Sequence, residues 1–393
     1  MSRRVVVTGY GVVSALGVGA EENAQALMRG LSGIGEVRYL PTEHHEFPVG
    51  EVKLSNEALR LQLGIPDGQP CSRTFLLGTM ALREALDHAH LRNHPHLALV
   101  SGTTVGGMDV TEQHYPNPLP ASEMDIHDCG ASTQAMADYF GLFDYASTVS
   151  TACSSAMNAM ILGKLLIETG ERDIVVAGGA EALSLFHLNG FKSLMILDEQ
   201  PCRPFDKQRR GLNLGEGAAF LVLEDEELAH RRGADIFAVL SGTGNACDAF
   251  HQTASSEDGE GAFQAMRKAL QDAGLSPEQI DYVNAHGTGT PNNDASESAA
   301  LRRVFSGKVP PVSSTKSYTG HTTSASGSIE SVFCLLSMRH GFLPFQKEFE
   351  NIDEQCITPL SGNECPRGEW RHLMCNSFGF GGNDSSIILS RYE

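Results

Sequence analysis

The stretch Thr151-Ala-Cys-Ser-Ser-Ala-Met-Asn-Ala-Met-Ile-Leu-Gly-Lys-Leu-Leu-Ile167 joins a turn of small residues to a run of apolar residues at helical spacing. This pattern predicts the start of a buried helix. Cys153 stands in its first turn, where free backbone N–H groups and the positive end of the helix dipole favour a thiolate over a thiol. We therefore expect a lowered pKa for Cys153 and a role as a nucleophile.

Two further segments place histidines in turns rich in Gly, Thr and Ser. Their sequences are Asn284-Ala-His-Gly-Thr-Gly-Thr-Pro291 and Lys316-Ser-Tyr-Thr-Gly-His321. A lone Cys or His is more often a core residue than a catalyst, so each segment alone is a modest signal. Together, a thiol nucleophile and two imidazoles are the equipment of thioester chemistry.

Short β-branched runs alternate along the chain with stretches of helical periodicity. This alternation predicts an α/β protein with buried, largely parallel strands. The predicted strands are Val5–Thr8, Leu97–Ser101, Ile174–Ala177, Phe220–Leu223, Ile236–Leu240, Tyr282–Asn284, Leu373–Cys375 and Ser385–Leu389. The predicted helices are Ala20–Arg29, Arg73–His88, Ala156–Glu168, Glu260–Ala273 and Ala295–Phe305.

The same alternation restarts in the second part of the chain, which indicates an internal duplication. Cys153 and Thr322 occupy related places, each in a turn of small residues before an apolar helix. The charged segment 224–233 is predicted to be a surface helix and turn between the halves. We therefore divide the chain into an N-terminal half, 1–233, and a C-terminal half, 234–393.

The bulk properties of the chain exclude several classes of function. Its 393 residues, 41% of them hydrophobic, suffice for the core of a globular protein. A net charge of −19 argues against a nucleic-acid or anionic-membrane surface, since both need clustered positive charge. Nine cysteines without a Cys-x-x-Cys pair predict reduced thiols in the cytoplasm. The apolar run at Val5 is too short to span a membrane, so we interpret it as a strand.

Two other patterns suggest ligand sites that we do not favour. Gly9-Tyr-Gly11 follows a strand as a dinucleotide-binding loop does, but Ser14 stands at the third glycine position. The histidines between Asp87 and His96 resemble a zinc-binding cluster, yet they lie at a helix end that contains Asn and Pro. We interpret them as solvated surface residues and expect neither a nucleotide nor a metal.

Several motifs resemble, in order and spacing, those of β-ketoacyl-[acyl carrier protein] synthases of the elongating kind, in the thiolase superfamily. Besides the three segments above, they are Arg3-Arg-Val-Val-Val-Thr-Gly-Tyr-Gly-Val-Val-Ser-Ala-Leu-Gly17, Arg203-Pro-Phe-Asp206, Gly215-Glu-Gly-Ala218 and Asn376-Ser-Phe-Gly-Phe-Gly-Gly-Asn383. The resemblance runs nearly from end to end. It implies a thiolase-like α/β fold, a five-layered α-β-α-β-α sandwich built from two duplicated halves.

The resemblance also implies a reaction and its partners. Such enzymes accept an acyl group on sulfur, decarboxylate a malonyl thioester and join the resulting carbanion equivalent to the acyl carbon. No cofactor or metal is implied, because the loss of carbon dioxide drives the condensation. The implied partners are acyl- and malonyl-loaded acyl carrier proteins and a second subunit, either an identical chain or a homologous chain-length factor.

The resemblance assigns reacting groups to four residues of this chain. Cys153 is implied as the nucleophile, and its N–H group with that of Phe380 as the oxyanion hole. His286 and His321, as neutral imidazoles, are implied to bind the malonyl carbonyl and to promote loss of carbon dioxide. Two histidines, rather than His and Asn, indicate the elongating branch.

Further residues are implied to support this site. Lys316 and Glu330 match a buried ion pair that orients His321 and tunes the charge on Cys153. A polar network behind His286 is expected from Asp294 and Glu297, with surface or helix-capping charge as the alternative. The residues assigned to substrate binding are Thr288, Thr290, Gly381 and Gly382.

An acidic carrier protein needs a basic patch on this acidic chain. The candidates are Lys207, Arg209 and Arg210, beside the Arg203-Pro-Phe-Asp206 motif, and a solvated charge run is the alternative that stays open. The polar stretch Thr111–His127 is predicted to be a long excursion, which in this family helps to shape the acyl pocket and the dimer contact.

Two other functions on the same fold stay open. A chain-length-factor subunit shapes the product without catalysis, but such subunits lose the active cysteine, whereas Cys153 is present. A thiolase acting on coenzyme A thioesters needs a second catalytic cysteine near the C-terminus. Cys375 precedes the final glycine-rich loop, yet it sits in an apolar strand, so we interpret it as an inert core thiol.

The chain departs from the family pattern in its loops. The segment Thr322-Thr-Ser-Ala-Ser-Gly-Ser-Ile-Glu330 is richer in hydroxyl groups than usual, and Asn383-Asp384 replaces a common Thr-Asn. Arg210 stands where an acidic residue is common. These departures favour a specialised pathway, such as polyene or polyketide chain extension, over housekeeping fatty-acid synthesis.

Overall fold

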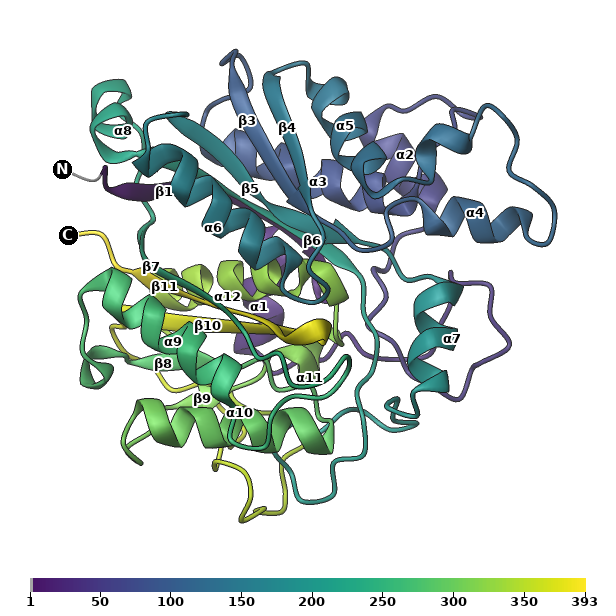
Figure 1. The fold of residues 1–393 in the computed structure, drawn as a ribbon. Coiled ribbons are helices and arrows are strands. Elements are labelled where there is room, and N and C mark those ends of the chain that lie inside the picture. Colours follow the sequence, from purple (N-terminus) through teal and green to yellow (C-terminus); the bar gives the residue numbers. More distant parts are fainter. Residues whose placement is uncertain (1–2) are drawn as a thin grey trace.

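The computed structural model describes residues 3–393, and within that range eleven strands form one continuous sheet (Figure 1). The strands are β1 (Val5–Ser14), β2 (Gly17–Val18), β3 (Leu97–Gly102), β4 (Phe143–Val149), β5 (Ile174–Glu181), β6 (Gly217–Asp225), β7 (Ala238–Cys247), β8 (Tyr282–Asn284), β9 (Val312–Ser313), β10 (His372–Gly379) and β11 (Asn383–Ser390). The α-helices are α1 (Ala20–Met28), α2 (Asn56–Leu63), α3 (Arg73–His88), α4 (Met108–His114), α5 (Cys129–Phe140), α6 (Ser155–Glu168), α7 (Leu185–Ser193), α8 (Glu226–Arg232), α9 (Glu260–Ala273), α10 (Pro291–Val304), α11 (Lys316–Thr319) and α12 (Ser326–His340).

Apart from the short β2, which pairs with β1, the sheet consists of two five-stranded halves with the same topology. The first half has the order β1-β6-β5-β3-β4, and the second has the order β7-β11-β10-β8-β9. In each half the first two pairings are antiparallel and the next two are parallel. The halves join where β1 pairs with β7. The topology confirms the predicted duplication, whereas the boundary between residues 233 and 234 stays a prediction.

The helices complete five layers around the two half-sheets. Helices α3 and α5 pack on the outer face of the first half-sheet, α9 and α10 pack on that of the second, and α6 and α12 lie between them (Figure 1). The central layer is apolar, because Met157 and Met160 of α6 and Phe333 of α12 share one buried cluster with residues of both half-sheets. The predicted α-β-α-β-α sandwich is confirmed.

Glycines in β1 and β7 let the outer helices approach the sheet closely. A Cβ atom at Gly11 of β1 would lie 2.1 Å from the carbonyl oxygen of Ala81 in α3. A Cβ atom at Gly244 of β7 would lie 2.1 Å from the carbonyl oxygen of Ala265 in α9. The duplication therefore extends to single backbone contacts, and only glycine fits at either position without a shift.

All the predicted strands and helices are present, but the expected strand direction is wrong. In the middle of the sheet β6, β1, β7 and β11 pair antiparallel. A strand that is buried on both faces has a continuous apolar sequence whatever its direction, so composition does not distinguish the two arrangements. The edge strand β4 escapes prediction because its half-buried sequence Phe-Asp-Tyr-Ala-Ser-Thr-Val lacks an apolar run. The apolar pattern also leaves β9, α2, α5 and α7 unpredicted.

The charged segment 224–233 forms the predicted helix and turn. Helix α8 begins after Asp225, whose side chain accepts a hydrogen bond from the Leu228 N–H, and it ends at Gly233 in the left-handed conformation. Glu224 is not a surface residue, because it is buried and accepts two hydrogen bonds of 2.7 Å from Arg232. Among the described residues, no helix has both the length and the apolar character that crossing a bilayer requires.

Replacing Gly11 tests the close contact between β1 and α3. We expect Gly11→Ala to lower the free energy of unfolding by about 1–3 kcal/mol, because the new methyl group overlaps the Ala81 carbonyl. Gly190→Ala in α7 is the control, since no atom lies within 4 Å of its added Cβ, and it should leave stability unchanged or slightly raised. Urea unfolding measures both, and equal effects would contradict the packing described here.

Candidate active site

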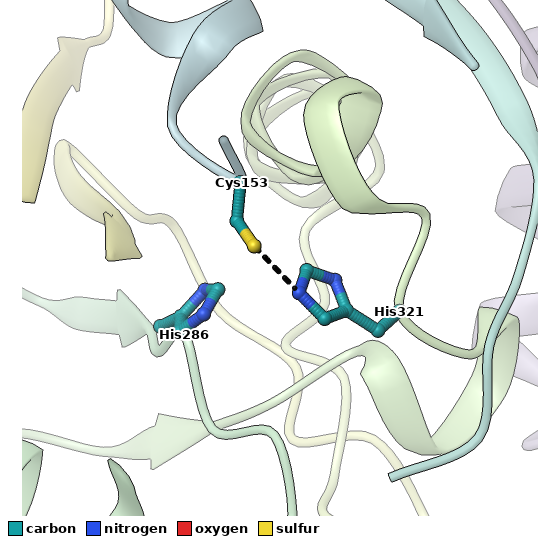
Figure 2. Close-up of side chains that lie close together, drawn as sticks. All are labelled: Cys153, His286 and His321. Carbon is teal, nitrogen blue, oxygen red and sulfur yellow. Dashed lines mark hydrogen bonds between the residues drawn. The ribbon is translucent and has the colours of Figure 1, made fainter. Parts of the chain in front are cut away.

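The three residues singled out in the sequence meet in one buried site. Cys153 lies in the turn between β4 and α6, His286 follows β8, and His321 follows α11. The Cys153 Sγ atom lies 3.1 Å from His321 Nε2, and the two imidazole rings are 5.3 Å apart and nearly perpendicular (Figure 2). Each of the three residues is at most 5% exposed. The site therefore joins a thiol from the first half to two imidazoles from the second.

The turn that carries Cys153 has a defined backbone geometry. Ala152 adopts a left-handed conformation with φ 52°, and the Ser155 hydroxyl accepts a hydrogen bond of 2.9 Å from the Thr151 N–H. Helix α6 begins only at Ser155, so Cys153 precedes the helix instead of lying in its first turn. The matching left-handed residue before α12 is Thr323, with φ 45°. The structural counterpart of Cys153 is therefore Ser324, and the expected pairing with Thr322 is wrong by two residues.

The expected lowering of the Cys153 pKa is also wrong. Burial raises the pKa of the Cys153 thiol to about 11, although the Phe380 N–H and the charge of Lys316 act in the opposite direction. The loss of solvation outweighs the helix end, because removing a thiolate from water costs more than a few N–H dipoles restore. Burial and the nearby Lys316 charge also place the pKa values of His286 and His321 well below the usual range. The resting site thus holds a neutral thiol between two neutral imidazoles.

Lys316 and Glu330 form the predicted buried ion pair, with Nζ 2.5 Å from Oε1. Burial raises the pKa of Glu330 to about 7, against the effect of Lys316. The ring of His321 is held by a different residue, because its Nδ1 atom lies 3.0 Å from the Ser326 hydroxyl. The ion pair therefore acts on the site through its charge, and the expectation that it orients His321 is corrected in favour of Ser326.

The predicted polar network behind His286 is present. The Glu297 carboxylate accepts hydrogen bonds from the N–H groups of His286 and Gly287 at 2.9 and 2.8 Å, and burial raises its pKa to about 7. Asp294 accepts a hydrogen bond of 3.2 Å from the Gly289 N–H. Both carboxylates are buried and fix the backbone of the turn that carries His286. They are not surface charges.

The glycine-rich loop after β10 brings a second backbone donor to the sulfur. The Phe380 N–H favours the thiolate form of Cys153, and the Phe380 ring stacks on Phe191 with centroids 5.7 Å apart. The loop turns through Gly381 and Gly382, whose φ values of 81° and 76° suit glycine. The N–H groups of Cys153 and Phe380 therefore come from different halves of the fold.

A cavity of about 300 Å³ opens onto the reactive groups. The predicted substrate-binding residues Thr288, Thr290, Gly381 and Gly382 all line it. The sequence analysis missed other lining residues, because α7 has no clear helical pattern and the 253–255 segment carries no motif. These additional lining residues include Phe191, Ile196, Leu212, Thr253, Ser255 and Asn292.

The three candidate docking residues differ in exposure. Lys207 is exposed, and the side chain of Arg210 is 65% exposed beside Asp198. Arg209 is buried, forms an ion pair with Asp353 and donates to the Pro291 carbonyl oxygen, so it is unsuited to dock a partner. Its side chain instead holds the 206–209 segment against the start of α10.

The remaining sequence interpretations concern residues away from the site. Cys375 is fully buried in β10, and burial keeps the pKa of its thiol well above the usual range, which fits an inert core residue. His90 and His96 are exposed, as expected for solvated histidines. His88 is only partly exposed, because its Nδ1 atom lies 2.7 Å from the Tyr10 carbonyl oxygen and its ring packs on Tyr10.

Comparison with known proteins places this geometry in a family. Residues 2–229 match the family model described as beta-ketoacyl synthase, N-terminal domain, and residues 237–350 match the beta-ketoacyl synthase, C-terminal domain. The chain therefore belongs to the beta-ketoacyl synthase family. It is 33% identical to 3-oxoacyl-[acyl-carrier-protein] synthase 2 of Coxiella burnetii and to that of Vibrio cholerae, with 99% of each chain covered.

Solved structures of ketosynthases are also similar to this chain. The chain is similar to the ishigamide ketosynthase/chain length factor, with 33% identity, full coverage of both chains and a TM-score of 0.93. It is also similar to a ketosynthase in complex with its chain length factor from Xenorhabdus doucetiae, with 32% identity, 99% and 98% coverage and a TM-score of 0.86. A third similar structure is a type II polyketide synthase acyl-carrier protein in complex with its ketosynthase, at 27% identity, full coverage and a TM-score of 0.88.

The raised pKa of Cys153 predicts how its alkylation depends on pH. A thiol with a pKa of about 11 is almost entirely protonated at pH 7, so the rate with iodoacetamide should rise about tenfold per pH unit from pH 7 to 10. Intact mass measures adduct formation. Alkylation of the other eight cysteines is measured in a Cys153→Ala variant and subtracted. A plateau below pH 8 would contradict a neutral resting thiol.

The effect of mutating the buried ion pair on stability should depend on whether one charge is left buried without its partner. Glu330→Ala should lower the free energy of unfolding by about 3–5 kcal/mol, because it leaves the Lys316 charge buried without its partner. The double variant Lys316→Met with Glu330→Leu should recover most of that loss without recovering activity. Glu227→Ala, which breaks the exposed pair with Arg231, should have little effect in the same urea titration. Equal losses at the buried and exposed pairs would refute this account.

Proposed function

We propose that this protein is an elongating β-ketoacyl-[acyl carrier protein] synthase, an acyltransferase that joins an acyl group to malonyl-carrier protein with loss of carbon dioxide. The observation that carries the proposal is the meeting of Cys153, His286, His321 and the Phe380 N–H at one buried cavity. Family membership and the names of the relatives support it.

In the first step the acyl group moves to Cys153. The thiol proton passes to His321 Nε2, 3.1 Å away, as the sulfur attacks the thioester carbon of the acyl carrier protein. The N–H groups of Cys153 and Phe380 hold the oxyanion that forms. When the intermediate collapses, the carrier sulfur leaves and takes the proton from His321. Transfer of the proton with the attack explains how a thiol of high pKa can react at neutral pH.

In the second step malonyl-carrier protein loses carbon dioxide. The neutral imidazoles of His286 and His321 donate to the thioester carbonyl oxygen, which becomes the enolate oxygen as the carboxyl group leaves. Low pKa values keep both rings neutral across the physiological range. The Ser326 hydroxyl can donate to or accept from His321 Nδ1, so it serves both tautomers that the two steps require.

In the third step the carbon–carbon bond forms. The enolate carbon attacks the acyl carbon on Cys153, and the same two N–H groups hold the new oxyanion. The sulfur then leaves as thiolate and takes up a proton from solvent, so each turnover consumes one proton. The product is a β-ketoacyl group on the carrier that brought the malonyl unit. Thr288 and Thr290, whose hydroxyl oxygens lie 2.9 Å apart, and Gly381 and Gly382 bind the thioester arm along the cavity wall.

The two rival functions are less well supported. A chain-length factor needs no catalytic set, whereas all three reactive side chains are in place here. A thiolase that uses Cys375 as its second cysteine requires that thiol at the cavity, and Cys375 is fully buried in β10 and absent from the cavity lining. The site therefore fits a condensation driven by loss of the malonyl carboxyl group better than a thiolase reaction.

Partners and pathway form the finer part of the proposal. Carrier proteins dock on the exposed Lys207 and Arg210, and the second subunit is either an identical chain or a chain-length factor, as in two of the similar structures. The hydroxyl-rich 322–330 loop and the similarity to polyketide ketosynthases favour a polyene or polyketide pathway. Nine free cysteines fit a reducing cytoplasm.

Loading of Cys153 tests the proposal directly. Wild-type protein incubated with a panel of acyl-carrier proteins should gain the mass of the acyl group, and Cys153→Ala should not. His286→Ala should load normally but fail to discharge the adduct with malonyl-carrier protein, with the rate reduced roughly 100-fold or more. Absence of an adduct for every donor, also with a co-expressed homologous subunit, would refute the synthase activity.

A further inference from the structure

The two donors of the proposed oxyanion hole belong to different halves of the fold. The Cys153 N–H lies in the turn between β4 and α6, and the Phe380 N–H lies in the loop between β10 and β11. That loop contains two glycines, Gly381 and Gly382, and Gly381 is exposed. Its other backbone contacts, from the Gly381 N–H to the Gln252 carbonyl and from the Asp248 N–H to the Gly382 carbonyl, are made within the second half. Contacts with the first half are therefore needed to hold the loop at a fixed position relative to Cys153.

Side-chain contacts cross from one half to the other at both ends of this loop. Before the glycines, the Ser377 hydroxyl donates a hydrogen bond of 2.9 Å to the Cys153 carbonyl oxygen. After them, the amide oxygen of Asn383 accepts a hydrogen bond of 2.7 Å from the Asn158 amide in α6. The loop that carries Phe380 is therefore tied to the Cys153 side of the site at both of its ends.

The amide oxygen of Asn383 is the most heavily used acceptor of this network. Besides Asn158, it accepts from the Asn245 amide at 2.9 Å, and the Ser154 hydroxyl lies 3.1 Å away. Ser154 has a single hydroxyl proton and lies 2.7 Å from the Thr151 carbonyl oxygen, so the two amides are the secure donors. A side chain without an acceptor at position 383 would leave both amides without this partner.

The other end of the tie is equally well defined. The Asn158 amide group also donates to the Thr151 hydroxyl at 2.9 Å, which anchors it to the turn before Cys153. Its amide oxygen accepts from the Ser385 hydroxyl at 2.8 Å and from Asn245 at 3.0 Å. The bond to Thr151 therefore ties Asn158 to the Cys153 turn, and its bond to Asn383 transmits the position of that turn to the glycine loop.

We propose that Asn158 and Asn383 are positioning residues that hold the Phe380 N–H at the distance from Cys153 that the oxyanion hole requires. This inference rests on the proposed function. It separates two parts of the reaction: acyl transfer to Cys153 uses the oxyanion hole, whereas decarboxylation of the malonyl thioester uses the two histidines. Loosening the tie should impair the first and spare the second.

The test compares the two rates in Asn158→Leu and Asn383→Leu. Formation of the acyl adduct, followed by intact mass, should slow tenfold or more in either variant, because a displaced oxyanion donor loses part of its effect of roughly 10²–10³-fold. Release of carbon dioxide from malonyl-carrier protein, measured in a Cys153→Ala background, should stay within about threefold. The combined Asn158→Leu and Asn383→Leu variant should be no slower in acylation than the slower single variant, since both remove the same bond.

Ser385→Ala is the matched control, because it removes another contact of Asn158 and leaves the bond between Asn158 and Asn383 in place. Its acylation rate should stay within about threefold of wild type. Urea unfolding midpoints establish that each variant folds. If Asn158→Leu does not fold, Asn158→Ala is used in its place. Equal losses of acylation and decarboxylation, or no loss of acylation, would overturn the inference. Failure of the wild type to form any adduct would instead overturn the proposed function.

Discussion

The site depends on the close packing of the first turn of α6 against glycines of three neighbouring elements. A Cβ atom at Gly102 of β3 would lie 2.4 Å from the Ala156 nitrogen, and one at Gly179 of β5 would lie 2.7 Å from the Ala156 Cβ. At Gly327 of α12 the distance to the Met157 Cβ would be 2.8 Å. These contacts bring the starts of the two central helices together, and with them Cys153 and His321.

Burial follows from this packing and determines the chemistry. Because both half-sheets cover the central layer, Cys153, His286 and His321 are removed from water and their charged forms are disfavoured. A neutral thiol beside a neutral imidazole can exchange a proton during attack, and neutral imidazoles can donate to an enolate. Lys316, whose charge lowers the pKa of both imidazoles, forms a buried ion pair with Glu330.

Motifs and periodicity predict those parts of this protein whose burial or function is visible in the pattern of residues along the chain. The bounds of α3, α9 and β8 match the apolar pattern, and the three motif segments converge as expected. Strand direction does not follow from composition, because buried strands look alike in both directions. The thiol pKa is mispredicted because the prediction lets the helix end outweigh burial, whereas the assembled layers remove Cys153 from water so completely that desolvation dominates. The burial of Arg209 and the contact of Ser326 with His321 depend on chain segments that only folding brings together.

The central claim is that one site in this protein couples decarboxylation to carbon–carbon bond formation. The most direct measurement is a single turnover of acyl-loaded enzyme with malonyl-carrier protein labelled with ¹³C at the methylene carbon, followed by mass analysis of the carrier. We expect one product, a β-ketoacyl carrier that contains both the acyl chain and the label, formed with one equivalent of carbon dioxide. Carbon dioxide release with only labelled acetyl-carrier protein, or transfer of the acyl chain without the label, would contradict it.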